Sequence, residues 1–450
     1  MFCFNACDLE DESEFSAQSN SVPLNDLIPA AISQLAYNQS ALHGRSCALI
    51  MHYLQSSESR VFFGNFNLPR TWYDATWIDG FYGGSLASAN EMKRLATEEG
   101  NNNVIAISLI LMANEFSSLT NTFGDIPFSE ALQGADNITP KYDSQEDIYQ
   151  EIFRMLDEAV QLIGSTGIAS GLGQSDLVYR GDMQAWRRLA NGLKARNLLN
   201  QRNQVPGMES EILSLIDASF SSSNEQANFN FDGDLNTNPL AKFGDERPST
   251  LLLNPYFSNI LIITDDPRFS SYAFSDFPAW QYYGDPQLTW SQFDSAIPIL
   301  SYTELLFMKA EVQFHMSASM DEVSSSLLDA ISSNMADNNV EIDSDVESFM
   351  SDAADLDGLN NEEALQKIIE QTYVSYYGYN FEQAWNNYRR TGYPDIVVEV
   401  DTPSPNNPSN ILPRRLLYPK NEVDFNQANL EEAASRQGGA LLDDDIWLFQ

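Results

Sequence analysis

Apolar residues recur at helical spacing through the first quarter of the chain. Residues 27–54 are largely apolar with small residues between them, and residues 74–98 carry aromatic and aliphatic side chains along one face. Residues 104–119 are almost continuously apolar, which indicates a central helix that is buried on most sides. The pattern therefore predicts closely packed helices in this part of the chain.

Further amphipathic helices follow. Ser144 is placed to cap a helix, with Asp147 three residues later, and Gly164 supplies the stop. Residues 186–199 predict another helix, whose bases we place on its wetter side. These bases are Arg187, Arg188, Lys194 and Arg196.

The character of the sequence changes at residue 219. Residues 219–298 are rich in Asn, Asp, Gly, Pro and aromatic residues without a helical period, so we expect loops, short strands and turns there. The tail from residue 395 is also irregular. Helical periodicity returns between these two regions, at residues 302–316, 324–335, 362–376 and 381–388.

The helices favour a mainly α fold in which amphipathic pairs stack into a TPR-like superhelix, although no strict TPR repeat is legible. With 450 residues, 43% of them apolar, the chain can bury a large core. We expect a single domain over residues 21–450. Its helical scaffold would occupy about 25–218 and 300–390, with an irregular lobe at 219–298 and an irregular tail at 395–450.

The net charge narrows the range of partners. Sixty-four acids against 24 bases give −40 at pH 7, so nucleic acid and anionic membrane surfaces are unsuitable partners. Such a surface stays soluble where salt screens its self-repulsion, which indicates a marine or halophilic source, with simple acidic drift as the alternative. Unfolding as NaCl is removed would support the halophilic hypothesis, and indifference to salt would contradict it.

The sequence contains no recognisable catalytic or metal-binding motif. His43, His52 and His315 are the only histidines, and none forms a zinc-binding pattern. Cys47 lies in an apolar stretch, as an inert buried thiol does, and the loop from Asp232 is better explained by a turn than by calcium. With 64 acids, carboxylate pairs arise by chance and are uninformative. We expect neither catalysis nor a cofactor nor a metal.

The N-terminus has features of a lipoprotein signal. Cys7 follows an apolar stub that ends in Ala6 and precedes an acidic, Ser-rich stretch, as at a bacterial lipidation site. Phe4 and Asn5 depart from the usual pattern. Residues 1–20 are therefore interpreted as a truncated signal with an acidic tether, and we expect lipidation at Cys7. No apolar run elsewhere reaches the length that spans a bilayer.

A set of ordered passages resembles one protein family. Residues 121–132 (NTFGDIPFSEAL), followed by 139–143 (TPKYD), are similar to the Gly-Asp-Ile-Pro signature of the SusD/RagB family, the surface nutrient-binding lipoproteins of Bacteroidetes. Further matching passages follow in the same order along the chain. They are residues 182–191, 266–268, 298–305, 384–385 with 391–394, and 413–415 with 418–419.

The resemblance implies a fold and a function. It implies four degenerate helix pairs packed against an irregular ligand-binding lobe, and anchoring by lipid alone at the outer face of the outer membrane. It also implies capture of an oligosaccharide or a peptide without catalysis, and delivery to a SusC-like TonB-dependent transporter. Two alternatives stay open, a helical secreted enzyme that degrades polysaccharide and a TPR-like scaffold that binds only protein.

Loop aromatics are the best candidates for ligand contact. Sugar rings have apolar faces that stack on Trp and Tyr, while amides and charged groups bind their hydroxyls. Two segments offer this mixture, residues 60–72 and 277–290, and both lie where the ligand-contacting loops of the family fall. We expect Trp77, Tyr82, Trp186 and Trp385 to be core residues instead. The predicted ligand-binding residues are Phe63, Phe66, Arg70, Trp72, Trp280, Tyr282, Tyr283 and Trp290.

Overall fold

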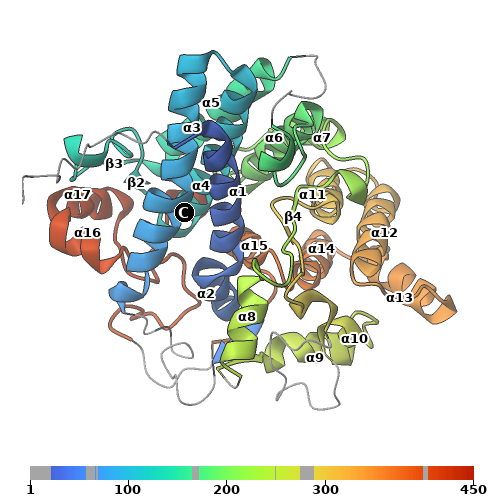
Figure 1. The fold of residues 1–450 in the computed structure, drawn as a ribbon. Coiled ribbons are helices and arrows are strands. Elements are labelled where there is room, and N and C mark those ends of the chain that lie inside the picture. Colours follow the sequence, from blue (N-terminus) through green and yellow to red (C-terminus); the bar gives the residue numbers. More distant parts are fainter. Residues whose placement is uncertain are drawn as a thin grey trace, which may run out of the picture.

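The computed structural model is predominantly helical (Figure 1). Cys7 and the rest of the predicted signal and tether lie outside the residues that it describes. The described residues are 22–56, 66, 69–164, 172–248, 250–273, 288–398 and 404–450.

The first half of the chain forms the predicted packed helices. The central helix α4 packs against both α3 and α5, α5 packs against α6, and α6 packs against α7. The predicted cap of α5 is confirmed, because the Ser144 side chain accepts a hydrogen bond from the Asp147 amide. The elements are α1 (Leu24–Ser40), α2 (Leu42–Ile50), the π-helix η3 (Thr76–Ser85), α3 (Leu86–Glu99), α4 (Asn102–Phe123), α5 (Gln145–Leu162), α6 (Met183–Asn200) and α7 (Glu209–Asp217).

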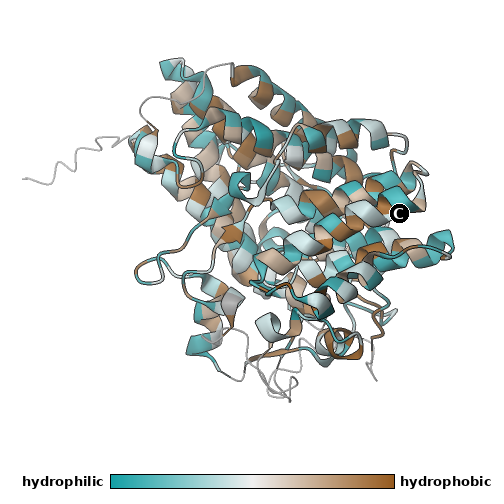
Figure 2. Ribbon diagram, turned by 90° about the vertical axis from the view of Figure 1, so that its right-hand side faces the viewer, coloured by the Kyte–Doolittle hydropathy of each residue, from teal (hydrophilic) through white to brown (hydrophobic). Residues whose placement is uncertain are grey.

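The second half continues the same array. Helix α11 packs against α7, α12 and α14, and α15 lies near the centre of the molecule against α2 (Figure 1). Apolar and polar residues alternate along the helices (Figure 2), as expected of helices with one buried face. The mainly α, TPR-like architecture is thus confirmed. The helices are α11 (Tyr302–His315), α12 (Met320–Asp337), α13 (Ser344–Ala354), α14 (Asn361–Ser375) and α15 (Phe381–Thr391).

Helix α4 is long and apolar enough to cross a membrane by length and composition, contrary to our expectation that no internal segment would be. However, 78% of its apolar window is buried inside the fold. Trp186 and Trp385 are also buried in this core, as predicted, and so are Trp77 and Cys47. Helix α4 is therefore the central core helix of this domain.

Helix α4 carries one buried carboxyl group, that of Glu115, which has no cation beside it among the described residues. Glu115 is 2% exposed and accepts hydrogen bonds from Asn38 Nδ2, at 2.7 Å, and from Ser85 Oγ. Burial raises the pKa of this carboxyl to about 7, although the hydrogen bonds from Ser85 and Asn38 oppose the shift. Glu115 is therefore protonated in the folded protein at pH values where the unfolded chain has already lost that proton.

Glu115 should make the protein less stable as the pH rises from about 4.5 to about 7. In that window the native state holds one proton more than the unfolded state, so the free energy of unfolding falls with pH. Between about pH 4.5 and 8, we expect the free energy of unfolding of native protein to fall by about 3 kcal/mol more than that of Glu115→Gln. Urea titrations at both pH values measure this difference, with Glu99→Gln, at an exposed position of α3, as control. Parallel pH profiles of native protein and Glu115→Gln would contradict it.

The segment at 219–298 is less irregular than predicted. It contains α8 (Pro239–Glu246), α9 (Pro255–Ile263) and the short α10 (Phe269–Tyr272), which lie together at the lower end of Figure 1. The predicted short strands are present as two-stranded antiparallel ribbons. These pair β1 (Leu54–Ser56) with β5 (Leu251–Leu253) and β4 (Asn228–Phe229) with β6 (Ile297–Pro298).

The C-terminal tail is also only partly irregular, because it contains α16 (Lys420–Phe425) and α17 (Gln427–Gln437). The Gly-Asp signature ties this tail to the scaffold. Asp125 accepts hydrogen bonds from the Gln145 amide, at 2.9 Å, and from Arg436 Nε, at 2.7 Å. Gly124 has φ of +81°, and a Cβ atom there would lie 2.0 Å from the Gln437 side chain. The signature thus joins the end of α4, the start of α5 and α17.

Candidate ligand-binding site

Four separate parts of the chain enclose a cavity of about 240 Å³. The ribbon of β4 and β6 forms one side, and the 3-10 turn η8 (Thr289–Ser291) forms another. The C-terminal end of α12 and the loop between α14 and α15 complete it. Helices of the scaffold and turns of the lobe therefore both contribute to this cavity.

Aromatic rings form the apolar wall of the cavity. The Trp290 ring packs edge to face on Tyr377, with their centroids 4.6 Å apart, and Tyr379 lies two residues further along the loop. Gly378 has φ of +95°, and a Cβ atom there would lie 3.4 Å from Trp290 Cβ. This glycine allows the loop to take its left-handed turn directly against the indole.

Amides and one carboxylate form the polar part of the lining. Asn334 and Asp337 come from the last turn of α12 and Asn338 is its C-cap, while Asn228 belongs to β4 and Gln226 lies two positions before it. Asp337 is the only charged group among the described residues that line the cavity. Desolvation raises the pKa of the Asp337 carboxyl, and a hydrogen bond from Thr303 acts in the opposite direction. The cavity thus offers aromatic surface beside neutral hydrogen-bonding groups.

A second cavity, of about 500 Å³, lies where α2, β1 and α9 meet. Its lining includes His52, Gln55, Tyr256 and Asn259. Burial lowers the pKa of His52 to about 4, so its imidazole is neutral near pH 7. A series of ring contacts connects the two cavities through the core. It runs from His52 through Tyr256, Tyr373, Phe257 and Tyr377 to Trp290.

The structure places the predicted site residues in different surroundings. Trp290 lines the first cavity. Phe66 is only 3% exposed and stacks on His52. This position suits a residue that packs against the core better than one that offers an exposed ring to a ligand. Arg70 donates from Nη1 to the Tyr418 carbonyl at 2.9 Å, and Trp72 packs near Arg45 beside α8. Phe63, Trp280, Tyr282 and Tyr283 lie outside the described residues.

Described residues at or near one end of each predicted loop line a cavity. Ser56, four positions before the first predicted loop, lines the second cavity, and Trp290, the last residue of the second predicted loop, lines the first cavity. Sequence reasoning missed Tyr377, Tyr379 and the α12 amides. The run of Tyr residues after α14, which breaks the helical period at Gly378, is the signal that could have identified the aromatic pair.

A buried Ser-His-Glu cluster resembles a catalytic triad in composition only. His43 Nε2 lies 3.0 Å from Glu382 Oε2 and 3.2 Å from Ser118 Oγ, and Ser118 also bonds to Glu382 directly. In a triad the imidazole uses opposite nitrogens for the nucleophile and the carboxylate. Here one nitrogen contacts both, and the His43 side chain is 2% exposed. The imidazole therefore does not stand between a nucleophile and an orienting carboxylate as in a triad, and we assign the cluster a structural role.

Within the described ranges, no group of three or more His, Cys, Asp or Glu side chains could hold an ion. The predicted turn at Asp232 is present, because its Oδ1 accepts from the Asp234 amide, at 2.9 Å, and from the Asn236 amide, at 2.8 Å.

A TPR-like helical scaffold with an aromatic, amide-lined cavity defines a class of ligand-binding proteins. A sequence profile described as SusD-like, starch-binding and associating with the outer membrane matches residues 16–419. The chain therefore belongs to the SusD-like family. No match was found among curated proteins.

Solved structures of this family share the fold. A SusD/RagB family protein of Bacteroides thetaiotaomicron is 20% identical, with a TM-score of 0.77 over 95% of this chain and 99% of its own. A SusD homologue of Bacteroides uniformis is 20% identical, with a TM-score of 0.79 over 94% and 99%. A chitin-binding SusD homologue from Flavobacterium johnsoniae is 21% identical, with a TM-score of 0.79 over 94% and 98%.

Proposed function

We propose that this protein binds an oligomeric nutrient, a neutral glycan rather than a peptide, at the cell surface and releases it unchanged. The observation that carries the proposal is the cavity in which Trp290 and Tyr377 stand beside the amides of α12. An aromatic face next to several neutral hydrogen-bonding groups suits the apolar face and the hydroxyls of a pyranose. The family description as starch-binding and the chitin-binding homologue support the same class of ligand.

The charge of the cavity and of the whole chain favours uncharged glycans. Asp337 is the only charged group among the described lining residues, and the net charge of the chain is −40. A uronic acid or sulfated sugar would meet repulsion both near the site and at long range. Neutral glucans and chito-oligosaccharides would not. We therefore expect acidic polysaccharides to bind poorly.

Delivery and anchoring form the second part of the proposal. We infer that a lipid on Cys7 holds the protein at the outer membrane and that it passes its ligand to a SusC-like TonB-dependent transporter. The family's association with the outer membrane supports this role. Release to a transporter requires a dissociation rate compatible with uptake, so we expect modest affinity.

A combined binding and turnover assay tests the function. Purified protein is titrated by calorimetry with maltohexaose, chitohexaose, an oligogalacturonate and a mixed peptide, and each supernatant is analysed for cleavage products. We expect heat of binding with a neutral hexasaccharide and intact sugar afterwards. Cleavage products would replace the proposal with a helical hydrolase. Binding of peptide alone would overturn the choice of a glycan, and no binding at all would leave a protein-binding scaffold.

A further inference from the structure

The nitrogen of one cavity-lining amide lacks a hydrogen-bond partner within the described part of the chain. Asn334 is 1% exposed and lines the cavity from the last turn of α12. Its Oδ1 accepts a hydrogen bond of 3.0 Å from Arg268 Nη1, whereas its Nδ2 has no hydrogen-bond partner among the residues that the structure describes. Leaving a buried donor unsatisfied destabilises the folded protein. The unsatisfied donor is therefore available to an acceptor that enters the cavity.

The direction in which Asn334 points is fixed by a buried ion pair. Arg268 is 0% exposed and donates from Nε and Nη2 to the two carboxylate oxygens of Asp266, at 2.9 and 2.5 Å. Its Nη2 also donates to Gln371 Oε1 at 2.7 Å. A guanidinium only donates hydrogen bonds, so the Asn334 atom that faces it must be the oxygen. The amide nitrogen is then left for the cavity.

We propose that Asn334 determines specificity by donating a hydrogen bond from Nδ2 to an uncharged oxygen of the bound sugar. That oxygen is a hydroxyl or an acetamido carbonyl of a ring lying against Trp290. Asp266 and Arg268, at residues 266–268 where the sequence resembles the family, are positioning residues that hold the amide in this orientation. The inference rests on the proposed function and adds which protein atom forms the hydrogen bond that selects the ligand.

Asn334→Asp tests the donor with little change of shape. The substitution keeps an oxygen for Arg268 and replaces the donating nitrogen by a second acceptor. We expect affinity for the neutral hexasaccharide that native protein binds to fall by about tenfold. Asn197→Asp is the matched control, because Asn197 is equally buried, at 1%, but does not line the cavity. Its affinity should equal that of native protein, and circular dichroism checks the fold of both variants.

Titrations with deoxy sugars distinguish the loss of one protein–sugar hydrogen bond from a general effect of the substitution on the structure. Maltotriose and triacetylchitotriose, each with analogues that lack one oxygen, are titrated into native protein and Asn334→Asp. Removal of one particular oxygen should lower the affinity of native protein by about tenfold and leave the affinity of Asn334→Asp unchanged. The inference alone is overturned if Asn334→Asp binds like native protein, or if no deletion weakens native binding. If native protein binds no sugar, the proposed function fails and this inference fails with it.

Discussion

Trp290→Ala should weaken binding of a neutral hexasaccharide by at least about 30-fold, equivalent to about 2 kcal/mol. Trp290 supplies the largest apolar face in the cavity, and its contact with Tyr377 holds the ring in place before a ligand arrives. Removing the indole deletes both the stacking surface and the wall that excludes water. Isothermal titration calorimetry of native protein and variant measures the loss.

Trp447→Ala is the appropriate control for this experiment. Trp447 is also partly buried and contacts another aromatic residue, Tyr149, but it lies in the C-terminal turn η9 (Trp447–Phe449) and does not line the Trp290 cavity. Its loss should leave affinity unchanged. Equal affinity of Trp290→Ala and native protein, with both folded, would move the binding site elsewhere, and the cavity beside His52 would be the next one to test.

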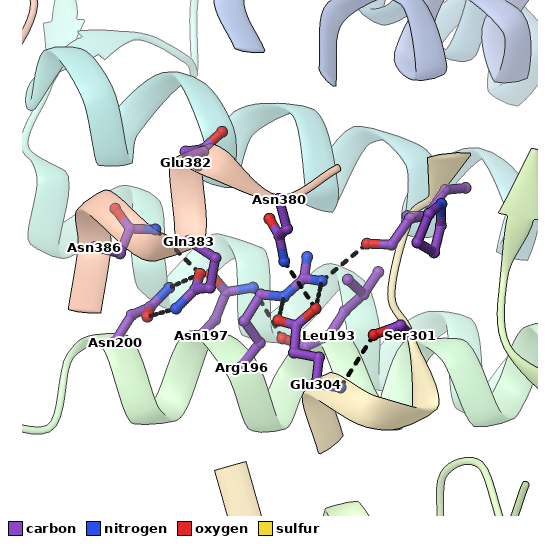
Figure 3. A network of polar contacts seen from close by, with 12 residues as sticks. Leu193, Arg196, Asn197, Asn200, Ser301, Glu304, Asn380, Glu382, Gln383 and Asn386 are labelled. Carbon is purple, nitrogen blue, oxygen red and sulfur yellow. Dashed lines mark hydrogen bonds and ion pairs between the residues drawn. The ribbon is translucent and has the colours of Figure 1, made fainter. Parts of the chain in front are cut away.

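Glu304→Ala should lower the free energy of unfolding by about 3–5 kcal/mol. The Glu304 side chain is 1% exposed and accepts bonds from Arg196 Nε and Nη2, both at 2.7 Å, and from Asn380 Nδ2, at 2.9 Å (Figure 3). The substitution leaves the Arg196 charge without its carboxylate in the interior. Since these three residues belong to α6, α11 and the start of α15, the loss affects the whole helix array. Guanidinium titration with linear extrapolation measures it.

An exposed ion pair gives the contrast for this prediction. Glu91 pairs with Arg94 on α3, where their side chains are 40% and 50% exposed. Because water and salt screen such pairs, Glu91→Ala should change stability by less than about 1 kcal/mol. A loss for Glu304→Ala no larger than that for Glu91→Ala would show that the buried network contributes nothing beyond its surface counterpart.

The helical scaffold could be predicted because its helices follow the hydrophobic period and carry legible caps, as Ser144 does for α5. The helices of the lobe were missed for a local reason. Helices α8 and α9 each begin with an Asn cap followed by Pro, at Asn238-Pro239 and Asn254-Pro255. The same dipeptide is a common turn signal, and it also starts helices because Asn caps them and Pro fits their first position. Two such short helices offer too few residues for a period to resolve the ambiguity.

The site could be predicted only in part. Trp290 stands out because it is an aromatic residue in a polar loop, whereas Asn334 lies inside a predicted helix and Tyr377 directly follows one, so both look like core residues until the fold brings them together. The surroundings of Arg196 could not be predicted from the local sequence either. Its expected place on the wetter side of α6 was wrong, because a buried carboxylate 108 residues away pairs with it. Pairings across such sequence distances leave no trace in a local pattern.

The cavity walls come from residues 226–228, 290–301, 334–338 and 375–379, so the cavity exists only where folding has brought these four separate segments together. A sugar that occupies it therefore binds only the completely folded chain. By mass action, each bound ligand draws the folding equilibrium toward that state. Under the proposed function, a molecule loaded with its cargo resists unfolding and proteolysis better than an empty one, and nutrient abundance itself prolongs the life of the protein that collects it.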